Sequence, residues 1–210
     1  MKKFSLAALA ASALIVMAAP AAATDFSFTG NFATDDDVAF FNFNVGASSL
    51  VTLVTYSYAG GVNAAGQTIA AGGFDPILSL YDSTGAKVGE NDDGGPGQVP
   101  IDTTSGNYWD TFFQATLGAG TYTVAVSQYS NFGPNNLSGA FPGSGTSNFE
   151  DDSGNIRDSH WAFDVLGVDS ATQPGGAVPE PATWAMMILG MGGIGSMIRR
   201  RRKTMQAATA

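Results

Sequence analysis

The stretch "GTYTVAVSQYS", residues 120–130, decides the fold class of this chain. It is rich in β-branched and aromatic residues, and its side chains alternate in polarity with a period of two. Those expected to face a core are Tyr122, Val124 and Val126, and those expected to face away are Thr121, Thr123, Ala125 and Ser127. The alternation predicts a strand in a sheet that covers a core with one face.

Seven other segments carry the same kind of strand signal. They are residues 26–30, 38–45, 50–58, 76–82, 86–91, 111–117 and 160–168. Turn-forming residues separate them, and long loops are expected at 60–73 and 130–159. Because no segment between 24 and 169 keeps a helical period, the expected fold is all-β, an antiparallel β-sandwich of about eight strands.

The N-terminus has the three parts of a secretory signal peptide. Lys2 and Lys3 precede an apolar run, residues 4–19, and "APAAA" (19–23) ends in small residues that signal peptidase accepts. We expect residues 1–23 to be removed by a cut between Ala23 and Thr24; an uncleaved anchor helix is the alternative. Either way, the protein is predicted to be exported.

Charge separates the body of the chain from its end. The sequence has nine basic and eighteen acidic residues, but between 24 and 177 only Lys87 and Arg157 are basic, against seventeen acids. Two cations against seventeen acids leave this span a formal charge of −15. So acidic a surface repels nucleic acid, which we exclude as a partner. The absence of cysteine excludes thiol catalysis and thiolate metal sites.

The pattern of the C-terminal region is typical of a short membrane anchor. Residues 182–198 carry no charge and are mostly apolar, and as a helix they would extend about 25 Å, at the short limit for a transmembrane helix. Five cations follow at 199–203, and the positive-inside rule places them in the cytoplasm together with residues 204–210. Residues 170–177, "SATQPGGA", are expected to be a flexible linker.

The order of a Pro-Glu-Pro triplet, an apolar segment and an arginine cluster over 178–203 resembles the PEP-CTERM sorting signal of Gram-negative bacteria. The residues that carry the resemblance are Pro179, Glu180, Pro181, Trp184, Arg199, Arg200, Arg201 and Arg202. The resemblance implies that an exosortase recognises and removes this tail, so that the transiently anchored body passes to the cell surface or matrix. It also implies an association with exopolysaccharide and biofilm.

The body resembles the bacterial pre-peptidase C-terminal domain. The resemblance is carried by "DDDVAFFNFNV" (35–45), "FDPILSLYDSTGAKVGENDDGG" (74–95) and "LGAGTYTVAVSQY" (117–129). It implies a jelly-roll-like β-sandwich over 24–169 that serves as an accessory module of a secreted protein. Some modules of this kind bind calcium or polymers.

Two acidic turns are candidate calcium sites, because calcium takes six to eight oxygen ligands and extracellular modules bind it at modest affinity. Their residues are Asn91, Asp92, Asp93, Asp151 and Asp152. The alternative is that these acids are solvated turn residues.

Aromatic residues in or beside loops could stack on sugar rings, the best candidates being Tyr108, Trp109 and Phe132. The alternative is that they cap the ends of the sandwich, together with Phe141 and Phe149.

Catalysis is not expected. His160 is the only histidine, which excludes a His-cluster zinc site, and no G-x-S-x-G motif accompanies a possible Ser-His-Asp set with Asp158 or Asp164. The expected function is that of a non-enzymatic surface or matrix protein. The alternatives are a calcium-dependent carbohydrate-binding module and a secreted hydrolase.

Overall fold

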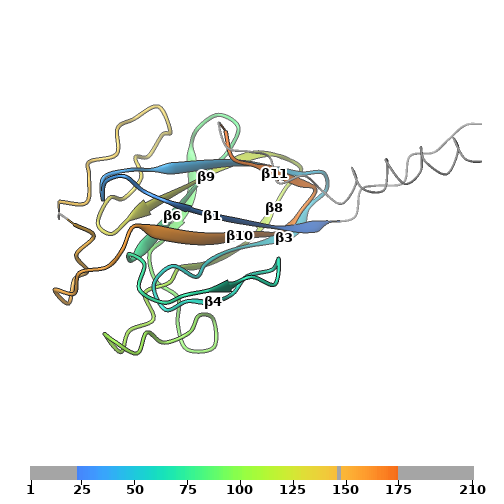
Figure 1. Cartoon of the computed structure of the whole chain (residues 1–210). Coiled ribbons are helices and arrows are strands. Elements are labelled where there is room, and N and C mark those ends of the chain that lie inside the picture. Colours follow the sequence, from blue (N-terminus) through green and yellow to red (C-terminus); the bar gives the residue numbers. More distant parts are fainter. Residues whose placement is uncertain (1–22, 146–147, 175–210) are drawn as a thin grey trace, which may run out of the picture.

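The computed structural model describes residues 23–145 and 148–174, which form two stacked β-sheets and a small hairpin (Figure 1). Within these residues, no helix has the length and apolarity needed to span a membrane. The predicted transmembrane helix, the cytoplasmic residues and nearly all of the predicted signal peptide lie outside the described residues. β1 starts at Thr24, the residue after the predicted cleavage point.

The first sheet has four antiparallel strands in the order β1-β10-β3-β8. Their bounds are β1 Thr24–Asn31, β10 His160–Val168, β3 Ser49–Thr55 and β8 Phe112–Leu117. The second sheet has five antiparallel strands in the order β11-β2-β9-β6-β7. Their bounds are β11 Ser170–Thr172, β2 Ala39–Val45, β9 Gly120–Gln128, β6 Pro76–Tyr81 and β7 Lys87–Asn91. All eight predicted strands are present, and the all-β antiparallel sandwich is confirmed.

An aromatic cluster fills the space between the sheets. The Phe41 ring of β2 lies 4.8 Å from that of Phe28, 5.2 Å from that of Phe163 and 5.4 Å from that of Trp161, all three on the opposite sheet. Alternate β2 residues face this core, because Phe41, Phe43 and Val45 are buried and Phe40 is exposed. Ring pairs at such separations add to the free energy of burying the rings.

The outer face of β9 differs in part from the prediction. Val124 and Val126 face the core as expected, but Ala125 and Ser127 are buried as well. The segment 130–145 is bonded to these strands: Ser127 Oγ donates to the carbonyl of Asn131 at 2.7 Å, Tyr81 of β6 donates to the carbonyl of Pro134, and Lys87 of β7 donates to the carbonyl of Gly133. Ala125 and Ser127 therefore face away from the core cluster as the alternation predicts, but they are buried on that face as well.

Two short elements were expected to be irregular. The predicted loop 60–73 contains a hairpin of β4 Gly61–Val62 and β5 Thr68–Ile69. The predicted linker 170–177 begins with β11, where Ala171 pairs with Phe43 and is buried against the core. Because Ala171 is buried, β11 is fixed to β2 and the sandwich extends to Thr172. The predicted domain boundary after Asp169 is corrected accordingly.

Candidate functional site

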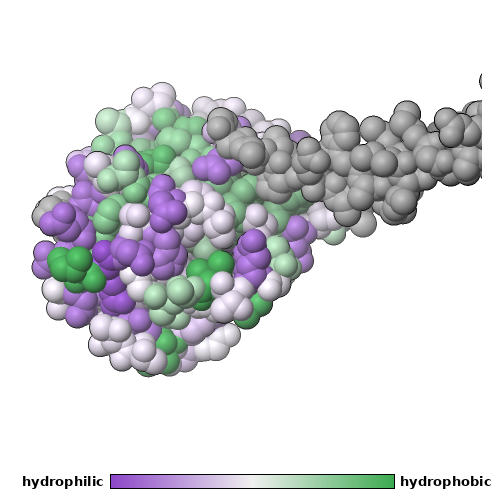
Figure 2. All heavy atoms as spheres, in the orientation of Figure 1, coloured by the Kyte–Doolittle hydropathy of each residue, from purple (hydrophilic) through white to green (hydrophobic). Residues whose placement is uncertain are grey.

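A small cavity of about 160 Å³ at one end of the five-stranded sheet collects acidic side chains. It is lined by Asp75, Asp92, Asp93, Asp152, Trp109 and Tyr129, and we call it the acidic cavity. Figure 2 shows hydrophilic residues gathered on the visible face at the end of the domain opposite the start of β1.

The strand register explains why these residues meet. Leu78 of β6 pairs with Asn91 of β7, so Asp75, just before β6, lies next to the acids that follow β7. On the other side of β6, the amide of Tyr129 donates to the carbonyl of Asp75 at 2.8 Å. Strand pairing therefore places Asp75 between the ends of β7 and β9, a relation that sequence spacing does not reveal.

Asp75 is an unusual carboxylic acid because it is only 5% exposed and its Oδ1 is buried without a hydrogen-bond partner among the described residues. Burial, followed by the nearby charges of Asp93 and Asp92, raises the pKa of Asp75 to about 9. Burial and the charge of Asp92 also raise the pKa of Asp93 to about 6. The cavity thus disfavours the charged form of these carboxyl groups and favours their neutralisation by a proton or a cation.

These carboxylates do not form a finished metal site. Among residues 23–145 and 148–174, no three His, Cys, Asp or Glu side chains are grouped so that they could hold an ion as they stand. Asn91, another predicted calcium ligand, instead donates from Nδ2 to the carbonyls of Asp93 and Phe112, at 2.6 and 2.8 Å. Its side chain therefore holds the turn after β7.

Asp151 has a different role from the one predicted. Its Oδ2 accepts hydrogen bonds from Arg157 Nε at 2.8 Å and from the Tyr58 hydroxyl at 2.7 Å, and its Oδ1 accepts from the amides of Ser153 and Asn155. Because donors occupy both oxygens, the structure assigns Asp151 to a buried ion pair. The prediction of Asp151 as a calcium ligand is corrected accordingly.

Arg157 is the centre of this buried cluster. It is 7% exposed, donates from Nη2 to Asp102 Oδ2 at 3.0 Å, and lies over the Tyr58 ring at 4.0 Å from the centroid. Lys87, the other cation of the described residues, pairs with Glu90 at 2.7 Å. Both cations are therefore engaged, so the surface of the described domain presents almost only acidic charge.

Another buried acid, Asp110, lies directly after Trp109. It accepts hydrogen bonds from Thr55 Oγ1 at 2.9 Å and from the amides of Tyr58 and Ala59 at 3.1 and 2.7 Å. Burial nevertheless raises the pKa of Asp110 above its ordinary value. Sequence reasoning missed Asp75, Asp102 and Asp110, because a single Asp beside a strand or turn resembles an exposed turn acid. The only available signal for Asp75 was its position before Pro76 in the 74–95 motif.

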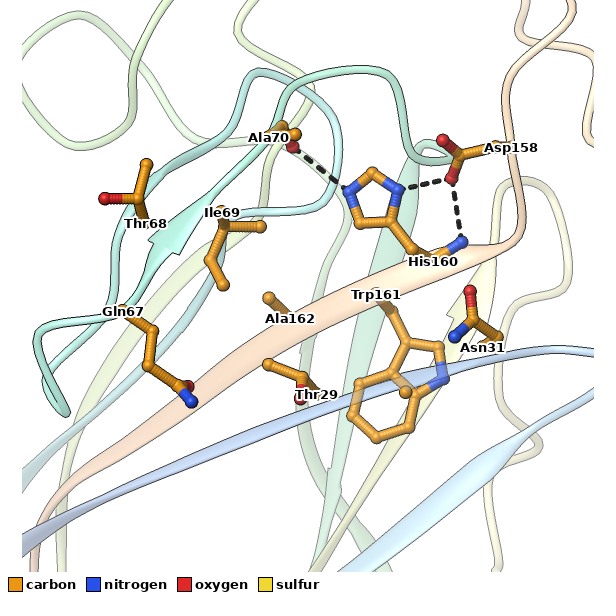
Figure 3. Close-up of a pocket in the computed structure, with 11 residues that line it drawn as sticks. Thr29, Asn31, Gln67, Thr68, Ile69, Ala70, Asp158, His160, Trp161 and Ala162 are labelled. Carbon is orange, nitrogen blue, oxygen red and sulfur yellow. Dashed lines mark hydrogen bonds and ion pairs between the residues drawn. The ribbon is translucent and has the colours of Figure 1, made fainter.

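A wider groove of about 550 Å³ with a mixed polar and apolar lining lies between the β4–β5 hairpin and strands β1 and β10 (Figure 3). Its lining includes Thr29, Asn31, Gln67, Thr68 and Trp161. The Nε1 of Trp161 is buried and has no hydrogen-bond partner within the described residues.

His160 closes one end of this groove. Figure 3 shows its ring between two acceptors, the Asp158 carboxylate at Nδ1 and the carbonyl of Ala70 at Nε2, the latter 3.1 Å away. Asp164, the other predicted partner, instead accepts from the amide of Ala64 at 2.7 Å. Since both ring nitrogens of His160 bind acceptors of the fold, its role in the structure is to tie the β5 end of the hairpin to β10.

Of the three predicted stacking residues, Trp109 and Phe132 lie at or beside the acidic cavity, and none of the three lines the groove. Trp109 lines the cavity, and its ring is 5.3 Å from that of Tyr58. Phe132 packs edge-on against Tyr129, which also lines the cavity, with ring centroids 5.6 Å apart.

The other loop aromatics have different neighbours. The rings of Phe141 and Phe40 are 5.9 Å apart, and those of Phe149 and Phe74 are 5.7 Å apart. Phe149 thus caps the core, as the alternative interpretation expected. Tyr108 is half-buried.

Comparison with known proteins gives two findings. Residues 177–203 match the family described as the PEP-CTERM protein-sorting motif, which confirms the resemblance of the tail and implies an exported protein that an exosortase sorts. Among solved structures, the chain is similar to the pre-peptidase C-terminal domain of a collagenase from Bacillus anthracis. The identity is 11%, the alignment covers 71% of this chain and 90% of that domain, and the TM-score is 0.33. That is the family which the body motifs resemble, but at this TM-score the likeness places no residue of one chain on the other. No curated protein matches the chain.

Proposed function

We propose that this chain is a non-enzymatic protein of the cell surface or extracellular matrix, which its C-terminal signal delivers through an exosortase. The observation that carries the proposal is the sorting motif at 177–203, next to a domain whose strands end at Thr172. Signal peptidase at the N-terminus and exosortase at the C-terminus are the processing partners. Exopolysaccharide is the proposed neighbour of the mature domain.

The contacts of the domain support a non-enzymatic role. The ring nitrogens of His160 are occupied by Asp158 and Ala70, and the guanidinium of Arg157 is held by buried acids. Residues that commonly act as general bases or anion clamps are therefore used here to hold loops. The acidic surface keeps such a domain soluble and away from anionic lipid once the tail is removed.

The sorting proposal is tested by substituting the motif in the producing cell. We expect wild-type protein to lose its C-terminal tail and to reach the surface or medium. A variant with Pro179→Ala, Glu180→Ala and Pro181→Ala should keep its full C-terminal mass and remain in the inner membrane. Gln173→Ala, which lies outside the motif, is the matched control and should be processed normally. Normal processing of the triple variant would contradict the proposal.

A second candidate function is binding of a carbohydrate polymer beside the acidic cavity. It is favoured by the position of Trp109 and Tyr129 in the cavity lining, with Phe132 against Tyr129. In a sedimentation assay with exopolysaccharide from the producing cells, Trp109→Ala should weaken binding about tenfold, equivalent to about 1.4 kcal/mol. Phe141→Ala, which changes an aromatic residue packed on Phe40, should bind like wild type. Equal binding by all three proteins would remove this candidate.

A further inference from the structure

We propose that the acidic cavity is a calcium site that is filled after export, and that the ion joins the β6–β7 end of the sandwich to the segment 148–159. This inference concerns the folded domain and does not depend on the sorting signal. It assigns a ligand set that differs from the two acidic turns read from the sequence, since Asp75 enters the set and Asp151 leaves it.

The first observation is the buried carboxylate at the base of the cavity. Asp75 is 5% exposed, lines the cavity, and has an Oδ1 that no donor among the described residues reaches. A buried polar atom without a partner costs free energy, and native structures rarely keep one without a compensating ligand. A cation bound to this oxygen would provide that compensation.

The second observation is the charge around it. Three more carboxylates, those of Asp92, Asp93 and Asp152, line the same cavity of about 160 Å³, and neither Lys87 nor Arg157 is in its lining. Like charges in so small a volume repel each other strongly because the protein around them screens poorly. Both of these cations are already committed elsewhere, Arg157 to Asp102 and Asp151 and Lys87 to Glu90.

The chemistry of the lining favours calcium over other metals. All four acidic ligands are hard oxygen donors, which suit calcium and magnesium and do not suit soft transition metals. They come from three separate segments, and the cavity has room for an ion with a few waters of about 30 Å³ each. Calcium accepts six to eight oxygens in irregular geometry, whereas magnesium requires a near-ideal octahedron.

Ion binding needs only a local adjustment. The carboxylates are not grouped to hold an ion as they stand, so we expect side chains to turn inward when the ion enters. Asp93 and Asp152 are the exposed members, and Asp151, the neighbour of Asp152, is fixed by Arg157 at 2.8 Å. The buried ion pair therefore presents Asp152 at the rim, where a bound ion can draw it in.

Terbium is a suitable probe because it takes the oxygen ligands of calcium and luminesces when a nearby indole or phenol ring is excited. Trp109 and Tyr129 line the cavity, so a terbium ion bound there lies next to both. We would titrate the full chain in detergent with terbium, compete with calcium and then with magnesium, and record the unfolding midpoint with calcium or chelator. Sensitised emission displaced by calcium, with a midpoint several degrees higher in millimolar calcium, is the expected result.

Variants identify the site. Asp75→Asn and Asp93→Asn should abolish the calcium-dependent shift of the unfolding midpoint. Asp152→Asn, at an exposed position that tolerates substitution, should raise about tenfold the calcium concentration needed for half of that shift. Glu150→Gln is the matched control, because it removes one exposed charge two residues from Asp152 outside the cavity lining. Its calcium response should equal that of wild type.

Three results would overturn the proposal. These are a wild-type protein without calcium response at millimolar concentration, an equal response to magnesium, and an equal loss of response in Glu150→Gln and Asp152→Asn. The last two would show that the ions only screen the acidic surface. If Asp75→Asn fails to fold, Asp152→Asn and its control still decide between the site and screening.

Discussion

Asp151 and Asp152 are adjacent in the chain but belong to different environments. Asp151 accepts a hydrogen bond from Arg157 Nε at 2.8 Å inside a buried cluster, whereas Asp152 is exposed and lines the acidic cavity. One turn therefore has two roles: its first acid fixes the segment 148–159 to the domain, and its second acid faces the cavity.

The first prediction concerns the two cations of the folded domain. Arg157→Met leaves Asp102 and Asp151 buried without their counter-charge and should lower the free energy of unfolding by about 3–5 kcal/mol. Lys87→Met removes a partly exposed pair with Glu90 and should cost about 1 kcal/mol or less. Denaturant unfolding of both variants measures the difference, and equal losses would contradict the central role of Arg157.

The second prediction is a loss of stability in acid. Burial alone would raise the pKa of Asp102, but hydrogen bonds from Arg157 and the amide of Ser105 hold it below the ordinary value of 3.8. Asp151 also has a lowered pKa, because the amide of Asn155, Tyr58 and Arg157 outweigh its burial.

A group whose pKa is lower in the folded state adds stability above its unfolded pKa and loses it as the pH falls through the folded value. The unfolding midpoint should therefore drop as the pH falls below about 4, because Asp102 and Asp151 then lose their contribution to stability. Asp102→Asn should be less stable at pH 7 and should show a shallower drop between pH 4 and pH 2. An unchanged slope in this variant would exclude Asp102 as a contributor.

The third prediction separates the two faces of β2. Phe41 is fully buried among three aromatic rings, so Phe41→Ala should cost about 3–5 kcal/mol through lost burial and a new cavity. Phe40, its neighbour, is 37% exposed and contacts only Phe141 among the ring pairs of the described residues. Phe40→Ala should cost about 1 kcal/mol, and similar losses in denaturant unfolding would contradict the observed strand orientation.

The fourth prediction assigns a structural role to His160. In His160→Ala, the hairpin β4–β5 loses its link to β10, so amide hydrogen exchange in residues 60–73 should become faster, while global stability falls by about 1 kcal/mol. Thr68→Ala, which changes another lining residue of the groove, should keep wild-type exchange rates in that segment. Unchanged exchange in His160→Ala would show that the hairpin is held without this histidine.

The strand pattern was predictable because β-branched and aromatic residues alternate over long segments, as in β9 and β2. Elements that depend on tertiary contacts could not be predicted from the sequence. β11 has only Ser170, Ala171 and Thr172, which carry too weak a signal without the neighbouring strand β2. The segment 130–145 likewise bonds to Ser127 of β9 without any periodic signal in its own sequence.

The candidate site shows the same limit. Asp92, Asp93 and Asp152 were found because they lie in acidic turns, but Asp75 joins them only through the pairing of β6 with β7 and β9. Asp151 and Asp152 look equivalent in the sequence, and only the burial of Arg157 distinguishes them. Sequence spacing thus located the acidic turns, whereas strand register determined which acids meet.

The central claim is that the chain is exported and processed at its C-terminal sorting motif. It is tested most directly by intact mass spectrometry of the protein recovered from producing cells with and without their exosortase. We predict that wild-type cells yield a product that begins at Thr24 and lacks the arginine cluster 199–202, and that exosortase-deficient cells yield one that keeps it. A wild-type product that retains Arg199–Arg202 in the surface or secreted fraction would contradict the account.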